Sequence, residues 1–264
     1  SVLISAACGA AAVPSAQRPY DNSAMPWTFD PRELVSTHDV VYEKPRGEPW
    51  EAMPVGGGDL SAMVRCTDGS LVLHLTKSDA WGFQQPPDAP QGSRFFNNVS
   101  PGTVTISLGE RAAALAAKRF RQRLDLYRGR IVVELGEAEK KITLSIWGDP
   151  QRTVLLVAMD DPQHLVPQAA VAVNEWRDSM RMWTDEDRIG AVEIHRRAAR
   201  PHLANTGMQG YFGANEDPLQ GRGTAVVVGA RQAAVSDLSK DEKTASMRLA
   251  FHDRTSRLIA ISCS

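Results

Sequence analysis

Three consecutive glycines, Gly56 to Gly58, are the first residues whose spacing could do chemistry, and they lie in the stretch WEAMPVGGGDLSAMV at 50–64. A dinucleotide-binding loop places glycines between a strand and a helix, where backbone N–H groups hold a pyrophosphate. Here Ser61 occupies the place of the third glycine, the following residues alternate like a strand, and no Lys-Ser/Thr pair completes a P-loop. We therefore predict that the glycines turn the chain and permit a close backbone approach.

Histidine, cysteine and serine show no spacing that is typical of a metal site or a nucleophilic triad. His195 and His202 are separated by arginines, whose charge opposes a bound cation. Cys8, Cys66 and Cys263 are too far apart for a ligand motif and allow at most one disulfide. No G-x-S-x-G motif is present, so we predict no nucleophilic triad. The histidine and cysteine spacings predict no metal site, and we expect no cofactor.

Composition limits the class of partner. The 264 residues carry 30 Lys and Arg against 31 Asp and Glu, a formal net charge of -1. So balanced a charge gives no field that would attract nucleic acid or an anionic membrane. The 42% of hydrophobic residues are enough to build a sizeable core without disulfide staples. We expect neither a nucleic-acid partner nor a membrane span.

The two ends of the chain suggest a piece of a secreted protein. Residues 1–17 read SVLISAACGAAAVPSAQ, an apolar run followed by small residues that suit signal peptidase. We assign 1–27 to a signal-peptide remnant and linker, and 28–264 to the folded domain. The expected location is secreted or periplasmic, and the sequence before Cys8 leaves a lipoprotein open. The apolar pattern at 256–263 predicts that more chain follows.

Hydrophobic residues repeat mainly with a period of two. Residues 59–66 alternate, an Asp-Gly turn follows, and 70–76 alternate again, which predicts a β-hairpin. We expect further strands at 119–126, 130–135, 141–147, 153–159, 166–173, 191–195, 224–228, 246–251 and 257–262. The stretch 111–118 is the one segment with a helical pattern, and 84–92 and 207–223 have the composition of long loops. These patterns predict an all-β fold, a large twisted antiparallel β-sandwich of more than about ten strands with short helical insertions.

Three motifs carry a resemblance to a known family. The run WEAMPVGGGDLSAMV, the hairpin after it, LTKSDAWG at 75–82 and FRQRLDLYRG at 120–129 have the order and spacing of conserved motifs in the N-terminal domains of glycoside hydrolase family 95. The likeness covers about residues 38–135 with motifs. Gly57 replaces an Asn of the family, Ser61 replaces a Gly, and 76–79 replace Asn-Glu-Asp. These departures bring the chain closer to an uncharacterised bacterial domain family of the same superfamily.

The resemblance implies that the catalytic residues lie in a different domain from this one. In the proteins that the chain resembles, an N-terminal β-sandwich leans on an α/α barrel, and the barrel holds the catalytic carboxylates. Glycoside hydrolysis needs two carboxyl groups that face one sugar. Glu51 and Asp59 both lie beside a loop that enters a strand, where acidic residues ordinarily face solvent. We therefore expect no catalytic pair in this chain and place it beyond residue 264, in a C-terminal α/α-barrel domain.

Lys77, Asp79 and Trp81 are the candidate substrate-binding residues that this resemblance suggests. Sugars are held by aromatic faces and by polar groups that take paired hydroxyls, and these types cluster just after a predicted core strand. The alternative is structural, with Trp81 plugging the edge of the sandwich and Asp79 starting a turn. Trp176 and Trp183 leave a similar choice between a stacking platform and an amphipathic segment packed on the sandwich.

Two functions of different classes remain open. One is an accessory domain of a secreted bacterial glycoside hydrolase, which packs on the barrel and lines its sugar pocket. The other is a free-standing module that binds carbohydrate or a surface partner without catalysis. Carbohydrate is the expected ligand of the first, and one of the two expected ligands of the second.

Overall fold

The computed structural model describes residues 29–84, 95–175, 180–194, 223–251 and 257–264. The predicted signal segment, most of the two predicted loops, Trp176, His195 and His202 lie outside these described residues. The predicted strands, helix and glycine turn can be compared with the fold.

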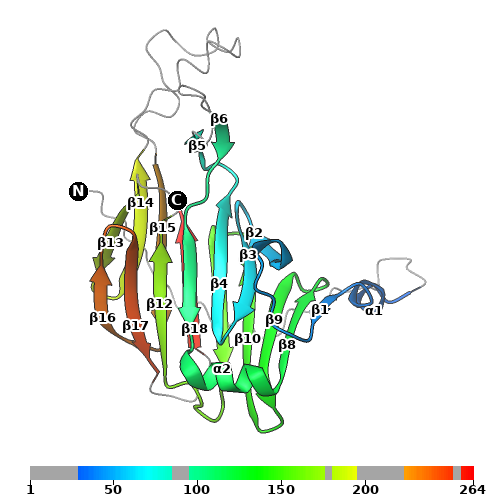
Figure 1. The fold of residues 1–264 in the computed structure, drawn as a ribbon. Helices are drawn as coiled ribbons and strands as arrows, with labels where there is room; N and C mark the ends of the chain where they lie inside the picture. Colours follow the sequence, from blue (N-terminus) through cyan, green and yellow to red (C-terminus); the bar gives the residue numbers. More distant parts are fainter. Residues whose placement is uncertain (1–28, 85–94, 176–179, 195–222, 252–256) are drawn as a thin grey trace.

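The described residues form two large antiparallel sheets that lie face to face, and a small two-stranded sheet (Figure 1). The nine-stranded sheet has the order β1 (Val40–Tyr42), β8 (Phe120–Asp125), β9 (Arg130–Glu137), β10 (Lys140–Gly148), β11 (Val154–Asp160), β18 (Arg257–Cys263), β15 (Gly223–Arg231), β14 (Arg188–Ile194), β13 (Arg181–Asp185). The seven-stranded sheet has the order β16 (Ala234–Lys240), β17 (Thr244–Ala250), β12 (Gln168–Asn174), β7 (Thr103–Ser107), β4 (Ser70–Lys77), β3 (Leu60–Thr67), β2 (Met53–Gly57). The predicted all-β antiparallel sandwich is confirmed.

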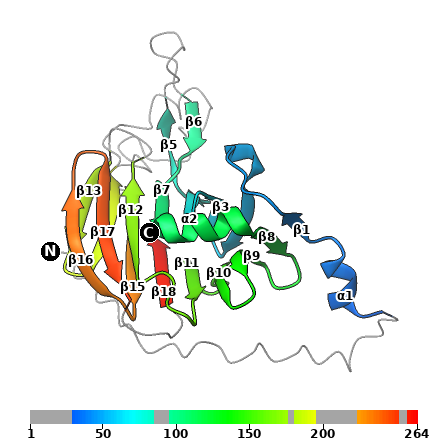
Figure 2. The ribbon, with the colours of Figure 1, turned by 60° about the horizontal axis from the view of Figure 1, so that its bottom comes forward.

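Two elements distinguish the ends of the sandwich. Helix α2 (Gly109–Lys118) lies across one end and buries Ala112, Leu115 and Ala116 (Figure 2). The helix predicted at 111–118 is thus confirmed, starting two residues earlier. At the other end rises the hairpin of β5 (Trp81–Gln84) and β6 (Phe95–Asn98) (Figure 1). The shorter helices α1 (Pro31–Ser36) and η2 (Pro49–Glu51) bury none of their residues.

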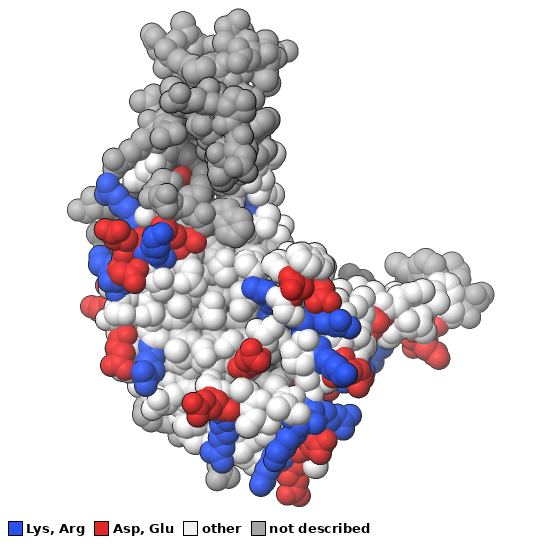
Figure 3. All heavy atoms as spheres, viewed as in Figure 1, with Lys and Arg blue, Asp and Glu red and all other residues white. Residues whose placement is uncertain are grey.

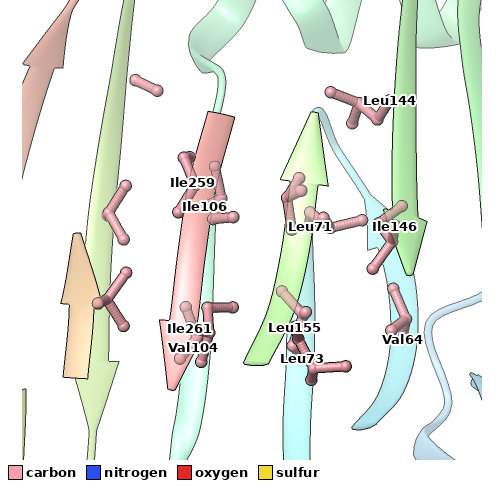
Figure 4. Packing of buried hydrophobic residues seen from close by; sticks show 14 of the residues in the cluster. Val64, Leu71, Leu73, Val104, Ile106, Leu144, Ile146, Leu155, Ile259 and Ile261 are labelled. Carbon is pink, nitrogen blue, oxygen red and sulfur yellow. The ribbon is translucent and has the colours of Figure 1, made fainter. Parts of the chain in front are cut away.

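The core fills the space between the sheets because alternate side chains of each strand point inward. In β4 the buried positions alternate with partly exposed ones, and β11 and β18 follow the same rule. Figure 4 shows members of the two inner faces in one layer: Val64, Leu71, Leu73, Val104 and Ile106 from the seven-stranded sheet, and Leu144, Ile146, Leu155, Ile259 and Ile261 from the nine-stranded sheet.

The glycine run joins the two sheets at the end that carries the β5–β6 hairpin. Gly58 has a φ of 63° in the turn between β2 and β3, while Gly57 still lies in β2. Gly57 and Gly148 touch backbone to backbone, since a Cβ on Gly148 would lie 2.3 Å from the Gly57 nitrogen. The predicted turn and close approach are therefore both confirmed, with two of the three glycines inside a strand.

Replacing Gly57 by Ala should destabilise the fold, because its Cβ would lie 2.6 Å from the carbonyl oxygen of Asp149. Overpacking of this kind lowers the free energy of unfolding by roughly 1–3 kcal/mol. Gly47→Ala is the matched control, since nothing lies within 4 Å of its Cβ, and it should change stability by less than about 0.5 kcal/mol. Urea unfolding of both variants measures the difference; equal stabilities would contradict the close approach.

Candidate functional site

Lys77 is a charged residue at a position that the fold reserves for core side chains. In β4 the side chains of Leu71, Leu73 and Leu75 point inward, and Lys77 continues the same row at the end of the strand. Only 5% of the residue is exposed. An ammonium group this buried must be paired, because an isolated charge in the interior is strongly unfavourable.

Two carboxylates provide that pairing. The Nζ of Lys77 donates to Oδ2 of Asp59 at 2.8 Å and to Oδ1 of Asp79. Asp59 lies in the turn after Gly58, and its Oδ1 accepts a hydrogen bond of 2.8 Å from the hydroxyl of Thr153. Since Thr153 precedes β11, this carboxylate connects the seven-stranded sheet to the nine-stranded sheet. We call Asp59, Lys77, Asp79 and Thr153 the lysine clasp.

The clasp fixes the charges of its members. The hydrogen bond from Lys77, helped by that from Thr153, holds the pKa of Asp59 below its ordinary value of 3.8. Burial alone would lower the pKa of Lys77, but the hydrogen bonds to Asp59 and Asp79 outweigh it and raise this pKa above 10.5. Asp59 and Lys77 are therefore both charged at neutral pH.

Trp81 lies beside the clasp on an anchored backbone. Its indole Nε1 donates to the carbonyl of Ser78 at 2.9 Å, and 40% of the residue is exposed. The amide of Asn98 donates to the carbonyl of Lys77 at 2.7 Å, which ties β6 to the end of β4. Two backbone hydrogen bonds fix the turn between them, from Ala80 to Lys77 and from Val99 to Ala80. The turn thus presents an exposed ring on a rigid base.

The structure brings the three candidate residues together but gives them different surroundings. Lys77 is buried and engaged, so it can orient Asp79 and is poorly placed to meet a ligand itself. The side chain of Asp79 is 67% exposed, and Trp81 is also exposed. Asp79 and Trp81 are therefore the two members that a ligand could reach. Their role in sugar binding stays a prediction.

The two carboxylates considered for catalysis are each engaged separately. Glu51 pairs with Arg46 at 3.1 Å, and Asp59 belongs to the clasp. A general acid needs a raised pKa, whereas the pKa of Asp59 is lowered. This arrangement does not suit glycoside hydrolysis.

Trp50 was not singled out from the sequence, although it opens the first motif. It is 79% exposed in η2. The loop below it is pinned, because Arg65 donates to the carbonyl of Gly47 and the guanidinium of Arg46 stacks 5.3 Å from the ring centre of Tyr42. A fixed, exposed indole could stack on a ligand. The sequence pattern that could have pointed to Trp50 is its place directly after Pro49, where a short helix starts.

The motif at 120–129 has a structural explanation. Asp125, 1% exposed, ends β8 and accepts hydrogen bonds from the backbone and the guanidinium of Arg128. Arg123 and Arg130 also pair with it, at 3.2 Å and 3.4 Å. Gly129 supplies the positive φ, 60°, that closes the hairpin. These residues shape the turn of the β8–β9 hairpin.

A second buried cation joins the sheets near the end that α2 covers. Arg257 at the start of β18 pairs with Asp161 at 3.0 Å and donates to the carbonyl of Val166 at 2.8 Å. Its guanidinium also lies over the ring of Phe251, 4.5 Å from the centre. Asp161 in turn accepts the backbone N–H groups of Leu165 and Val166. No local sequence pattern predicts this pair, whose members lie 96 residues apart.

Trp183 and two cysteines are the remaining candidates, and Trp176 lies outside the described residues. Trp183 lies in β13 with its ring on Gly190, where a Cβ would come within 2.6 Å of the indole, so Trp183 packs on the sheet. Cys66 and Cys263 are free and buried, and burial raises the pKa of each thiol to about 12. Neither is therefore a nucleophile at neutral pH. Within the described residues no cluster could hold a metal, and none of their helices is long and apolar enough to cross a membrane.

Asp59→Asn should destabilise the fold in a pH-dependent way. Because its folded pKa is below 3.8, Asp59 contributes fully above that pH, and its contribution is lost as the pH falls through the folded pKa. At pH 7 the loss should be about 1–2 kcal/mol, less than for a fully buried pair, because Asp79 still pairs with Lys77 and Asp59 is partly solvated. Thermal unfolding between pH 2 and 7 should show the difference from wild type shrinking at low pH.

The matched control is Asp187→Asn, which removes an exposed ion pair with Arg188. It should change the melting temperature little at any pH. A difference for Asp59→Asn that persists unchanged at pH 2 would contradict the charge assignment.

Comparisons with known proteins place the chain in a family. None of the curated proteins compared with it matches. A solved structure, a GH31 family sulfoquinovosidase from E. rectale in complex with an aza-sugar inhibitor, is similar with a TM-score of 0.30 and 9% identity. That match covers 76% of this chain and 32% of the other, so the chain spans about a third of that protein. A family model described as a domain of unknown function, DUF5703, matches residues 41–209. Since this match covers more than half of the sequence, the chain belongs to the DUF5703 family.

Proposed function

We propose that the chain is a non-catalytic accessory domain of a secreted or periplasmic bacterial glycoside hydrolase. The end of the sandwich that carries Trp81 borders the sugar pocket of a helical catalytic domain in the same polypeptide. The motif resemblance to glycoside hydrolase family 95 over residues 38–135 supports this proposal, and the specific relationship to that family is part of it.

The observation that carries the proposal is the arrangement of Asp79 and Trp81 at one end of the sandwich. Both side chains are exposed, while Lys77 and Asn98 fix the backbone from which they project. An aromatic face and a carboxylate on a rigid base are the groups that bind a sugar ring and its hydroxyls. Preorganisation of this kind reduces the entropy that binding costs.

The exposure of Trp81 favours the ligand interpretation over the structural one. A tryptophan that plugs a sheet edge would be largely buried, whereas this one is 40% exposed and keeps its Nε1 bound to Ser78. The hydrogen bond fixes the plane of the ring without covering it. We therefore assign Trp81 to substrate contact and Lys77 to positioning.

A free-standing carbohydrate-binding module is the second candidate, and Trp50 is the observation that favours it. Its indole is 79% exposed on a pinned loop that lies apart in sequence from the Trp81 turn. In that case Trp50, rather than Trp81, would contact the sugar. Variants of the two tryptophans separate the two functions.

Trp81→Ala in the full-length protein should reduce kcat/KM for its glycoside substrate. Loss of a stacking contact costs roughly 1–3 kcal/mol, by analogy with base–aromatic stacking, which is about a 5- to 150-fold reduction. Because Trp81 lies outside the main core, the melting temperature should fall by only a few degrees. Enzyme kinetics and thermal unfolding on the same variant give both values.

Trp50→Ala is the control and should leave kcat/KM unchanged. Unchanged kinetics in Trp81→Ala, with a large fall in melting temperature, would make Trp81 a structural residue. A loss of oligosaccharide affinity in Trp50→Ala alone would favour the free-standing module.

The isolated chain should not hydrolyse glycosides, because Glu51 and Asp59 are engaged in separate ion pairs and the pKa of Asp59 is lowered. Purified chain and aryl glycosides, followed by leaving-group absorbance, test this. Turnover that disappears in Glu51→Gln or Asp59→Asn would contradict it.

A further inference from the structure

The lysine clasp carries one negative charge in excess. Asp59 and Asp79 are two carboxylates, and Lys77 is the one ammonium group that pairs with them. Asp59 uses both of its oxygens inside the protein, Oδ2 on Lys77 and Oδ1 on Thr153. Among the described residues Asp79 is bonded only through Oδ1, to Lys77, and its side chain is 67% exposed. The excess negative charge is therefore presented to solvent at Asp79.

The side-chain N–H donors of the same turn are used within the protein. The ammonium group of Lys77 donates to the two carboxylates, and the indole Nε1 of Trp81 donates to the carbonyl of Ser78 at 2.9 Å. The amide of Asn98 donates to the carbonyl of Lys77 at 2.7 Å. The turn thus offers a ligand an acceptor, Oδ2 of Asp79, beside the neutral hydroxyl of the exposed Ser78. Because an ionised carboxylate only accepts hydrogen bonds, the ligand must supply the donor.

The exposed part of Trp81 has the same electrostatic preference as Asp79. Its Nε1 is bonded to Ser78, so the indole meets a ligand with its ring and not with its N–H group. The face of an aromatic ring carries partial negative charge, which attracts positive charge and disfavours an anion. Two exposed groups of different chemistry, a carboxylate and an aromatic face, therefore both disfavour a negatively charged ligand group.

Sugars differ in the groups with which they could meet Asp79. A hydroxyl group can donate to the open carboxylate oxygen. A uronic acid or a sulfate ester brings a negative charge and no donor. Lys77 could not neutralise that charge, because it is 5% exposed and already pairs with two carboxylates. An acidic sugar would therefore lose hydration and face a like charge, which weakens binding.

We infer that Asp79 selects sugars that carry no acidic substituent; this inference rests on the proposed function. The substrate class is then neutral sugars, which bind with a hydroxyl on Oδ2 of Asp79 and a ring face on Trp81. Lys77 is a positioning residue, because it holds Oδ1 and thereby fixes the direction of Oδ2. Uronic acids and sulfated sugars are rejected by the unpaired like charge, and such repulsion is a common source of specificity.

Asp79→Asn in the full-length protein tests the inference. The readout is the ratio of kcat/KM for a neutral glycoside to kcat/KM for the matching uronide, with nitrophenyl galactoside and galacturonide, and nitrophenyl glucoside and glucuronide, in both anomers. Asparagine has the shape of aspartate and still accepts the hydrogen bond from Lys77, so the substitution removes mainly the charge. Wild type should prefer the neutral glycoside, and the substitution should lower the ratio by at least about tenfold.

Asp237→Asn is the matched control, because the side chain of Asp237 is also 67% exposed and also pairs with one cation, Arg248, at 3.0 Å. This pair lies on the margin formed by β16 and β17, where Figure 3 shows charges of both signs side by side. The control should keep the wild-type ratio. Asp79→Glu retains the charge and should keep the preference for the neutral glycoside, whatever it does to the separate rates. In about 0.5 M sodium chloride the preference of wild type should shrink, because salt screens exposed charges.

A binding measurement makes the test independent of hydrolysis. Ligand-observed NMR on the full-length protein gives the affinities of methyl galactoside and methyl galacturonide, and of the corresponding glucoside and glucuronide. The ratio of these affinities should favour the neutral sugars and should also fall by at least about tenfold in Asp79→Asn. Far-ultraviolet circular dichroism checks the fold; if Asp79→Asn does not fold, Asp79→Ser replaces it.

The outcomes separate this inference from the proposed function. Hydrolysis of glycosides with an unchanged ratio in Asp79→Asn, or with a wild-type preference for the uronide, would overturn the inference alone. An equal fall of the ratio in Asp237→Asn would also overturn it, since the effect would then come from the net charge of the protein. A protein that hydrolyses no glycoside, but whose preference for binding neutral sugars falls in Asp79→Asn, would overturn the proposed function and support the selection by Asp79. Failure to hydrolyse or bind any of these sugars would overturn both.

Discussion

A buried ammonium group that must stay paired determines the architecture at one end of this sandwich. Lys77 continues the inward row of β4, where every earlier member is apolar, so its charge needs partners that the core cannot supply. Asp59 and Asp79 meet that need, and Asp59 reaches across to Thr153 in the other sheet. The turn at Gly58 and the contact of Gly57 with Gly148 bring Asp59 within reach. Fold and candidate site therefore depend on the same interaction.

The ion pairs that stabilise the buried Lys77 also position the side chains that the proposed function uses. The carboxylate that neutralises Lys77 from the solvent side is Asp79, and Trp81 follows two residues later on the same anchored turn. At the far end of the sandwich, Arg257 and Asp161 form a second buried ion pair that joins the two sheets. The ends thus differ: one is closed by α2 and a fully buried ion pair, and the other presents a carboxylate and an indole.

Much of the fold could be predicted because alternation is a local signal. The hairpin of β3 and β4, the helix α2 and the strands β8 to β11 follow from periodicity and turn residues. Among the strands that were not predicted, β1, β2 and β16 are edge strands that are short, glycine-rich or without alternation. Gly56 and Gly57 show the reason, since a strand can contain glycines where another backbone crosses it. The central strand β7 was also missed, although its five residues alternate between buried and partly exposed positions.

The candidate site was predictable only in its local part. The local part consists of Lys77, Asp79 and Trp81, which lie within five residues at the end of a predicted strand. Residues this near in sequence must also lie near one another in space. Thr153 is 94 residues from Asp59, and no local pattern connects them.

A structure of the full-length protein with a bound sugar analogue tests the central claim most directly. The account predicts the sugar ring in contact with Trp81 near Asp79. A sugar bound at the end that α2 covers, or to another domain altogether, would contradict it.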